Sequence, residues 1–107
     1  MKCIDESTIR YAAALLAAAA GPSRVILFGA YARGNAGAQS DLDLLVVEPV
    51  VTNRLREMTR LRQVLRPLRI PVDLLVCSKA ELATREHLPT GAIHWALQEG
   101  KTLHDSL

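Results

Sequence analysis

The sequence is poor in cysteine and in long apolar runs, and each shortage excludes a class of protein. Only two of the 107 residues are cysteines, Cys3 and Cys77. A disulfide scaffold of this size would need more, so we expect reduced thiols and a cytoplasmic protein. The Ala-rich stretch 11–20 is halted by Gly21-Pro22. Because a membrane-spanning helix needs about 20 apolar residues, we expect no membrane span, and the N-terminus lacks the apolar core of a signal peptide.

Charge of one sign and aromatic residues are also scarce. The formal net charge is +2 at pH 7, which gives no reason to expect a nucleic-acid partner. Aromatic residues make up 4% of the chain, too few to suggest a series of base-stacking platforms. Half of the residues are hydrophobic and 22% are charged, which is typical of globular proteins. We therefore expect residues 1–107 to form one domain with a single core.

Helix and strand patterns alternate along the chain. Apolar residues at helical spacing predict two long helices, the first ending at Gly21-Pro22 and the second capped by Thr52, with Leu55 in its apolar stripe. Thr90 is expected to cap the last helix. Short runs rich in β-branched residues predict strands. The expected helices cover 5–20, 30–33, 52–66, 79–87 and 91–99, and the expected strands 24–29, 42–47, 72–78 and 101–105. The strands are nearly continuous apolar runs, which predicts an α/β fold with a small mixed sheet flanked by helices.

Acidic residues stand at the start of two of these apolar strands. Asp41 and Asp43 flank Leu42, and Asp73 opens the next strand. Side chains two positions apart on a strand share a face, about 6–7 Å apart along the backbone, so the first two carboxylates repel each other unless a cation lies between them. If the two strands are neighbours, all three carboxylates converge and suit a pair of Mg²⁺ ions. A single Asp at a strand start is more often a turn residue, so this interpretation depends on all three.

A glycine turn precedes these carboxylates in the sequence. The first expected strand ends at Gly29, Ala30 begins a short helix, and ten residues separate this turn from Asp41. Backbone N–H groups at such a turn can hold phosphate, Gly29 permits close approach of the backbone, and Arg33 is a candidate charged donor. Ser40 is a candidate for capping the Asp41 turn and for contact with a nucleotide.

Together, the Gly29-Ala30 turn, the spacer of ten residues, Asp41-Leu42-Asp43 and the later Asp73 resemble the signature of the polymerase-β-like nucleotidyltransferases. At this length the chain resembles the minimal nucleotidyltransferases (MNT), which are often antitoxins encoded beside HEPN-domain ribonuclease toxins. The resemblance covers nearly the whole chain. It implies the polymerase-β-like fold, Mg²⁺ as cofactor, ATP as substrate, a HEPN toxin as partner and transfer of AMP to a protein hydroxyl.

The resemblance also implies a role for each residue of the site. Asp41 and Asp43 would hold both ions and the triphosphate. Asp73 would hold the ion nearer the acceptor and help to activate its hydroxyl. Gly29 and Ala30 would cradle the β- and γ-phosphates.

One position departs from the family pattern, because the family usually has Ser where this chain has Ala30. A hydrogen bond to a charged group is worth about 1.5–3 kcal/mol, so we expect weakened rather than abolished triphosphate binding. Two alternatives stay open: a catalytically weak antitoxin that acts by protein–protein binding, and a nucleotidyltransferase that acts on a small molecule or RNA. A domain this short forms one wall of a cleft, so we expect a homo-oligomer or a complex with a HEPN-like protein.

The second long helix is unusually basic and contains one acid, Glu57. We interpret it as a solvated basic face, with docking of an acidic partner or of RNA as the alternative. Its arginines are Arg54, Arg56, Arg60, Arg62 and Arg66, followed by Arg69.

The remaining candidates have simpler explanations. The histidines share no short spacing, so we expect no zinc site; they are His87, His94 and His104. Trp95 is expected to pack the last helix onto the sheet.

Overall fold

The computed structural model describes residues 4–85 and 91–107. In chain order its elements are α1 (Glu6–Ala20), β1 (Arg24–Phe28), α2 (Ala30–Arg33), β2 (Leu42–Glu48), α3 (Arg54–Leu65), the 3₁₀ helix η1 (Arg66–Leu68), β3 (Val72–Ser78), α4 (Lys79–Arg85), α5 (Ala92–Glu99) and β4 (Lys101–Asp105). None of the helices in these described ranges is long and apolar enough to cross a membrane.

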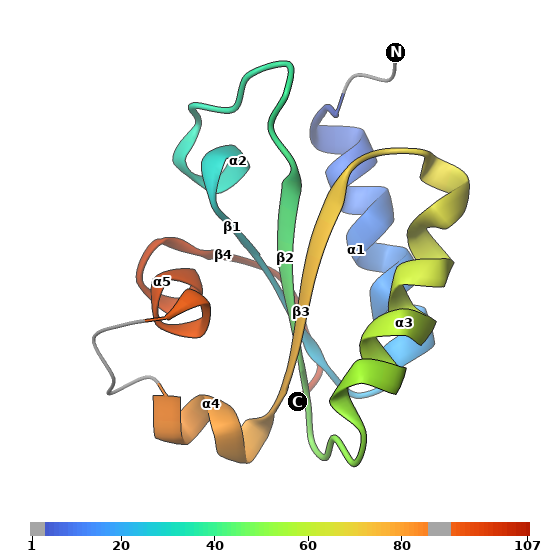
Figure 1. Cartoon of the computed structure of the whole chain (residues 1–107), viewed down its shortest axis with the longest axis vertical. Coiled ribbons are helices and arrows are strands. Elements are labelled where there is room, and N and C mark those ends of the chain that lie inside the picture. Colours follow the sequence, from blue (N-terminus) through green and yellow to red (C-terminus); the bar gives the residue numbers. More distant parts are fainter. Residues whose placement is uncertain (1–3, 86–90) are drawn as a thin grey trace.

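The four strands form one mixed sheet in the order β3-β2-β1-β4 (Figure 1). Strands β2 and β3 are parallel, whereas β1 is antiparallel to both β2 and β4. The parallel pair needs a crossover connection, and α3 with η1 provides it. The predicted α/β fold with a small mixed sheet flanked by helices is therefore confirmed.

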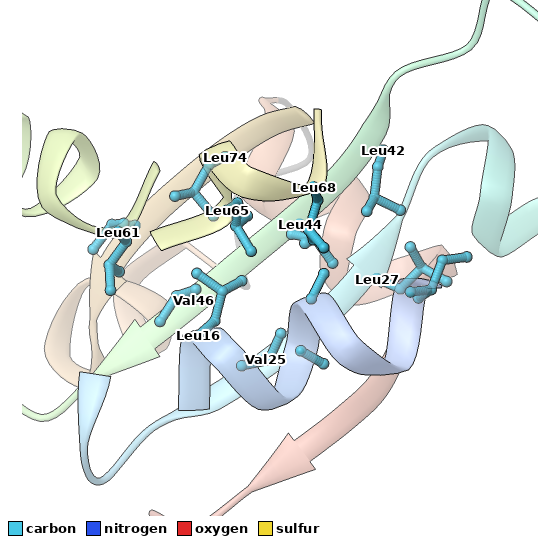
Figure 2. Close-up of a cluster of buried hydrophobic side chains, with 14 of the residues drawn as sticks. Leu16, Val25, Leu27, Leu42, Leu44, Val46, Leu61, Leu65, Leu68 and Leu74 are labelled. Carbon is cyan, nitrogen blue, oxygen red and sulfur yellow. The ribbon is translucent and has the colours of Figure 1, made fainter. Parts of the chain in front are cut away.

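Helices cover both faces of the sheet, and alternate strand residues enter two cores. Figure 2 shows the core beneath α1 and α3, where Leu16, Leu44 and Leu61 are fully buried. The core on the opposite face, beneath α4 and α5, contains Ile26, Phe28, Leu45, Val47, Cys77 and Ala96. Because side chains alternate along a strand, Asp43 belongs to the same face of β2 as Leu45 and Val47. The carboxylate site therefore lies on the α5 side of the sheet.

The long helices begin at side-chain caps. The Asp5 carboxylate accepts a hydrogen bond of 2.8 Å from the Thr8 backbone N–H, which lowers the pKa of Asp5 and satisfies a free N–H of the first turn. The cap of α3 lies one residue later than predicted, because the Asn53 side chain, and not Thr52, accepts from the Arg56 N–H at 3.1 Å. The prediction that Thr90 caps the last helix falls outside the described residues.

Two apolar side chains expected in the core are exposed instead. Leu55 was expected in the apolar stripe of α3 but is 75% exposed, because the buried face of that helix is formed further along, at Leu61 and Leu65. Trp95 was expected to pack α5 onto the sheet but is 55% exposed. The next residue, Ala96, takes the buried position, and consecutive helical residues point about 100° apart.

Candidate functional site

The starts of β2 and β3 bring the predicted acidic residues together. In the parallel pair, Asp43 is the register partner of Asp73, and paired residues of neighbouring strands share a face. Asp41 lies one residue before β2. The Leu42 N–H donates a 2.9 Å hydrogen bond to the Pro71 carbonyl, which aligns the two strand starts. Asp41 and Asp73 are exposed and Asp43 is half-buried.

Gly29 lies directly against the Asp43 carboxylate. Phe28, the last residue of β1, is the register partner of Asp43, and the chain turns at Gly29 with a φ of +74°. A Cβ atom added at Gly29 would overlap Asp43 Oδ2 and lie 2.9 Å from Asp43 Cγ. Glycine is therefore required at this position for two reasons. Its φ is positive, and the Asp43 carboxylate fills the space that a side chain at position 29 would occupy.

Asp43 is the electrostatic centre of the site. Burial raises the pKa of Asp43, and the charges of Asp73 and then Asp41 raise it further, while Arg33 opposes them. The first two effects disfavour the charged form for different reasons, namely loss of solvation and repulsion between like charges. The site therefore carries surplus negative charge, which a bound cation would neutralise.

Glu99 is a residue of this site that sequence reasoning missed. The carboxylate at the end of α5 forms an ion pair of 2.8 Å with Arg33 Nη1 of α2, and the charge of Glu99 also raises the pKa of Asp43. Arg33 was predicted as a phosphate donor, and its guanidinium lies close enough to Asp43 to lower the pKa of that carboxyl. No local pattern in the sequence could have identified Glu99, because it is 66 residues away from Arg33.

Ser40 closes the loop that leads to Asp41. Its hydroxyl accepts a 2.9 Å hydrogen bond from the Gly37 N–H, and its own N–H donates to the Gly37 carbonyl at 3.1 Å. These two bonds tie the last residues before β2 into a turn. Contact between Ser40 and a nucleotide remains a prediction.

The carboxylate oxygens of the site are the kind of ligand that a hard divalent cation prefers, although the side chains are not arranged around a single point. Among the described residues, no group of three or more His, Cys, Asp or Glu side chains is arranged to hold a metal ion. The expected close cluster of Asp41, Asp43 and Asp73 is thus not preformed. Three carboxylates whose charges repel at one strand edge nevertheless supply the oxygen ligands that Mg²⁺ prefers, and two of them are exposed side chains that can turn toward an ion.

The arginines of α3 lie on the other side of the sheet. Arg60 forms a bidentate pair with Glu57 at 2.7 and 2.8 Å, and Arg54 pairs with Glu81 of α4. A shallow depression of about 640 Å³ follows this helix from Asn53 to Gln63. It is open and not enclosed, and the carboxylates on the α5 side remain the candidate site. His87 lies outside the described residues.

Comparisons with known proteins establish the family and the fold. The model of the family described as "Nucleotidyltransferase domain" matches residues 11–93, a range that contains the glycine turn and all three aspartates. No curated protein sequence matches the chain significantly.

Crystal structures of toxin–antitoxin proteins share the fold at low sequence identity. One, determined with AMP-PNP, has a TM-score of 0.65 and 19% identity over 90% of this chain and 73% of the other. A mutant of the toxin–antitoxin MntA–HpeT, in which two aspartates two positions apart are replaced by glutamate, has a TM-score of 0.65 and 18% identity over 95% and 74%. A Tyr-to-Ala mutant of MntA–HpeT has a TM-score of 0.62 and 20% identity over 96% and 74%.

Proposed function

The chain belongs to the nucleotidyltransferase domain family, and from this membership we propose that it is the antitoxin of a HEPN–MNT pair, an enzyme that transfers AMP from ATP to a protein hydroxyl. The observation that carries the proposal is the contact between the Gly29 turn and Asp43, which is in register with Asp73. A turn suited to phosphate and a set of repelling carboxylates meet there, as binding of a metal-complexed triphosphate requires.

The similar structures support the choice of substrate and partner. They are toxin–antitoxin proteins, one of them crystallised with AMP-PNP, an analogue of ATP. The two aspartates replaced in one of the MntA–HpeT mutants have the same spacing as Asp41 and Asp43. Both points favour a nucleotide-dependent antitoxin over an unrelated use of the fold.

In the proposed reaction, an acceptor hydroxyl attacks the α-phosphorus of ATP in line with the leaving group. A new P–O bond joins AMP to the acceptor, the bond to the β-phosphate oxygen breaks, and pyrophosphate leaves. Asp41 and Asp43 would hold two Mg²⁺ ions, with Asp73 on the ion nearer the acceptor, and the bound ions supply neutralisation of the phosphate charge. Asp73 would also help to activate the acceptor hydroxyl.

The Gly29-Ala30 turn would hold the β- and γ-phosphates through backbone N–H groups, since the first N–H groups of a helix have no partner within that helix. Ala30 offers no hydroxyl to a phosphate oxygen. Arg33, in the short helix that follows the turn, offers a positive charge that is shared with Glu99. The turn therefore binds triphosphate with fewer donors than a Ser at position 30 would allow.

We further propose that the partner is a cytoplasmic HEPN-domain toxin, which completes the cleft. The described chain supplies one carboxylate-bearing wall, and an acceptor side chain must come from another molecule. The exposed arginines of α3 include Arg56 and Arg62, for which no ion pair is found within residues 4–85 and 91–107. They offer positive charge that can steer an acidic protein. A homo-oligomer is the other assembly that would cover this surface.

A second candidate function is inhibition of the toxin by contact alone. Ala30 favours it, because this residue offers no hydroxyl to a phosphate.

The test is incubation of the purified protein with its partner toxin, ATP and Mg²⁺, followed by measurement of intact mass. Addition of one AMP to the toxin, abolished by Asp43→Asn, supports the enzyme. Tight inhibition without added mass at high ATP concentration would support the contact-only antitoxin, and AMP found on RNA or a small molecule would overturn the choice of acceptor.

A further inference from the structure

We propose that Trp95 is the base-binding surface of this nucleotide site, on which the purine ring of the nucleoside triphosphate stacks. The inference rests on the proposed function, because it assumes that a triphosphate binds beside Gly29 and Asp43. It adds the part of the site that recognises the base, for which the carboxylates and the glycine turn offer nothing apolar.

The C-terminal end of α5 adjoins the carboxylate site. The ion pair between Glu99 and Arg33 joins this end of the helix to α2 at 2.8 Å. Directly after the helix, Lys101 of β4 pairs with Leu27 of β1, two residues before the Gly29 turn. The end of α5 is thereby held next to the place where the phosphates are proposed to lie.

Trp95 lies on the same flank of α5 as Glu99. Residues four positions apart in a helix are neighbours on its surface, and the rise between them is about 6 Å. The opposite flank carries Ile93 and Leu97, which pack against the sheet, and the buried Ala96 lies between the two flanks. The indole is therefore one helical turn from the residue that pairs with Arg33, a separation that the ribose and the base of a bound nucleotide can span.

Trp95 is also the one exposed aromatic side chain on this side of the sheet among the described residues. It is 55% exposed, while Tyr11, the other exposed aromatic, lies on α1 across the sheet (Figure 1). Phe28 is buried and Tyr31 packs against the core beneath α1. The ring of His94 meets the indole edge-on, at a centroid distance of 5.3 Å and an angle of 77°.

An indole suits a purine because stacking needs only two flat π-systems and apolar area. Every base has such a face, so stacking binds without strong selection among bases. Trp95 should therefore add affinity for nucleotides over bare polyphosphate and favour purines by their larger area, while ATP and GTP bind with similar affinity. The rival explanation for an exposed tryptophan is contact with a protein partner, and the experiment below separates the two.

The chain contains a single tryptophan, so its fluorescence reports on Trp95 alone. We would titrate the protein with ATP and with tripolyphosphate, both with Mg²⁺, and measure affinities by calorimetry for wild type, Trp95→Ala and Trp95→Phe. The expected result is quenching by ATP but not by tripolyphosphate. Trp95→Ala should weaken ATP binding by about 5- to 150-fold, the range for loss of one base stack, while tripolyphosphate binding stays the same and Trp95→Phe retains most of the affinity.

Leu55→Ala is the matched control, since it removes an exposed apolar side chain from α3 on the opposite face, and it should leave ATP binding unchanged. Circular dichroism checks that each variant is folded. Equal ATP affinity in wild type and Trp95→Ala would overturn this inference and leave the proposed function standing, as would quenching that needs the toxin and not ATP. If wild type binds neither ATP nor tripolyphosphate, the proposed function fails together with the inference.

Discussion

The carboxylate of Asp43 occupies the space in which a side chain at Gly29 would lie. The two residues come from antiparallel neighbours, since Asp43 is in register with Phe28 at the end of β1. The positive φ of Gly29 turns the chain away immediately after this pair. The contact places the backbone of the turn against a half-buried carboxylate whose pKa is raised, so a phosphate held by the turn would also lie next to the metal-binding positions proposed here.

Gly29→Ala should damage both stability and nucleotide binding. A φ of 74° with a ψ of −155° lies in a region that is almost restricted to glycine and costs a residue with a Cβ about 1–3 kcal/mol, and the new methyl group must displace the Asp43 carboxylate. Gly21→Ala is the matched control, because Gly21 has nearly the same backbone conformation, with φ 72° and ψ −140° against 74° and −155° at Gly29, but nothing lies within 4 Å of an added Cβ. Urea unfolding should show a larger loss for Gly29→Ala, and calorimetry should show loss of ATP binding for that variant only. Equal effects of the two substitutions would mean that the contact with Asp43 is unimportant.

Asp43→Asn should abolish transfer without loss of stability. The substitution removes a carboxylate whose pKa is raised by burial and by the charges of Asp73 and Asp41, so the folded state loses a repulsion. Because a raised pKa means that the folded state holds the proton more tightly, Asp43 costs stability only at pH values where it is ionised. The variant should therefore be more stable than wild type at pH 7, with a gain that shrinks as the pH falls toward 4. Thermal unfolding across this range measures the gain, and a loss of stability at pH 7 would contradict it. Transfer should fall by more than about 100-fold.

Ala30→Ser should tighten binding of ATP with Mg²⁺ by about 10- to 100-fold, the value of a hydrogen bond to a charged group. Position 30 is the first residue of α2 and directly follows the turn at Gly29, so the new hydroxyl would lie beside the proposed phosphate site. Isothermal titration of wild type and variant gives the comparison, and Ala30→Val is a control that adds bulk without a donor. If serine and valine have the same effect, the side chain at position 30 does not face a phosphate.

Glu48→Gln should change how stability depends on pH. Glu48 is 5% exposed at the end of β2, where burial and then its contacts with Glu57 raise its pKa to about 7. In the unfolded chain it ionises near its ordinary value of 4.5. The folded state thus binds a proton more tightly, and its stability falls as the pH rises from about 4.5 to 7.

The glutamine variant removes this cost and should exceed wild type by about 1–3 kcal/mol at pH 8, while the two are similar at pH 4.5. Urea unfolding at the two pH values provides the measurement. Glu57→Gln should instead destabilise the protein at both pH values, because hydrogen bonds to Arg60 and then to Glu48 lower the pKa of Glu57 from 4.5 to about 2. The stabilisation from this carboxylate is fully present above pH 4.5 and is lost as the pH falls toward 2. A glutamine variant at position 48 that is destabilised at pH 8 would rule out this account.

The sequence alone determined the alternation of helices and strands, the mixed α/β class and the positions of the three aspartates. These features are local, because apolar spacing sets the type of element and an Asp at a strand start is visible in the order of the letters. The parallel register of Asp43 with Asp73 could be anticipated only on the assumption that β2 and β3 are neighbours. The contact between Gly29 and Asp43 required the antiparallel pairing of β1 with β2, which the sequence does not specify.

Only the tertiary structure decided which apolar residues of the helices are buried and which distant charges meet. Leu55 and Trp95 match apolar helical patterns yet remain exposed, because the rotation of a helix against the sheet follows from the packing of all its residues together. Glu99 meets Arg33 across a separation of 66 residues, through the closure of β4 onto β1. The chemistry of a side chain follows from its residue type, but the residue that it contacts depends on how the complete sheet is assembled.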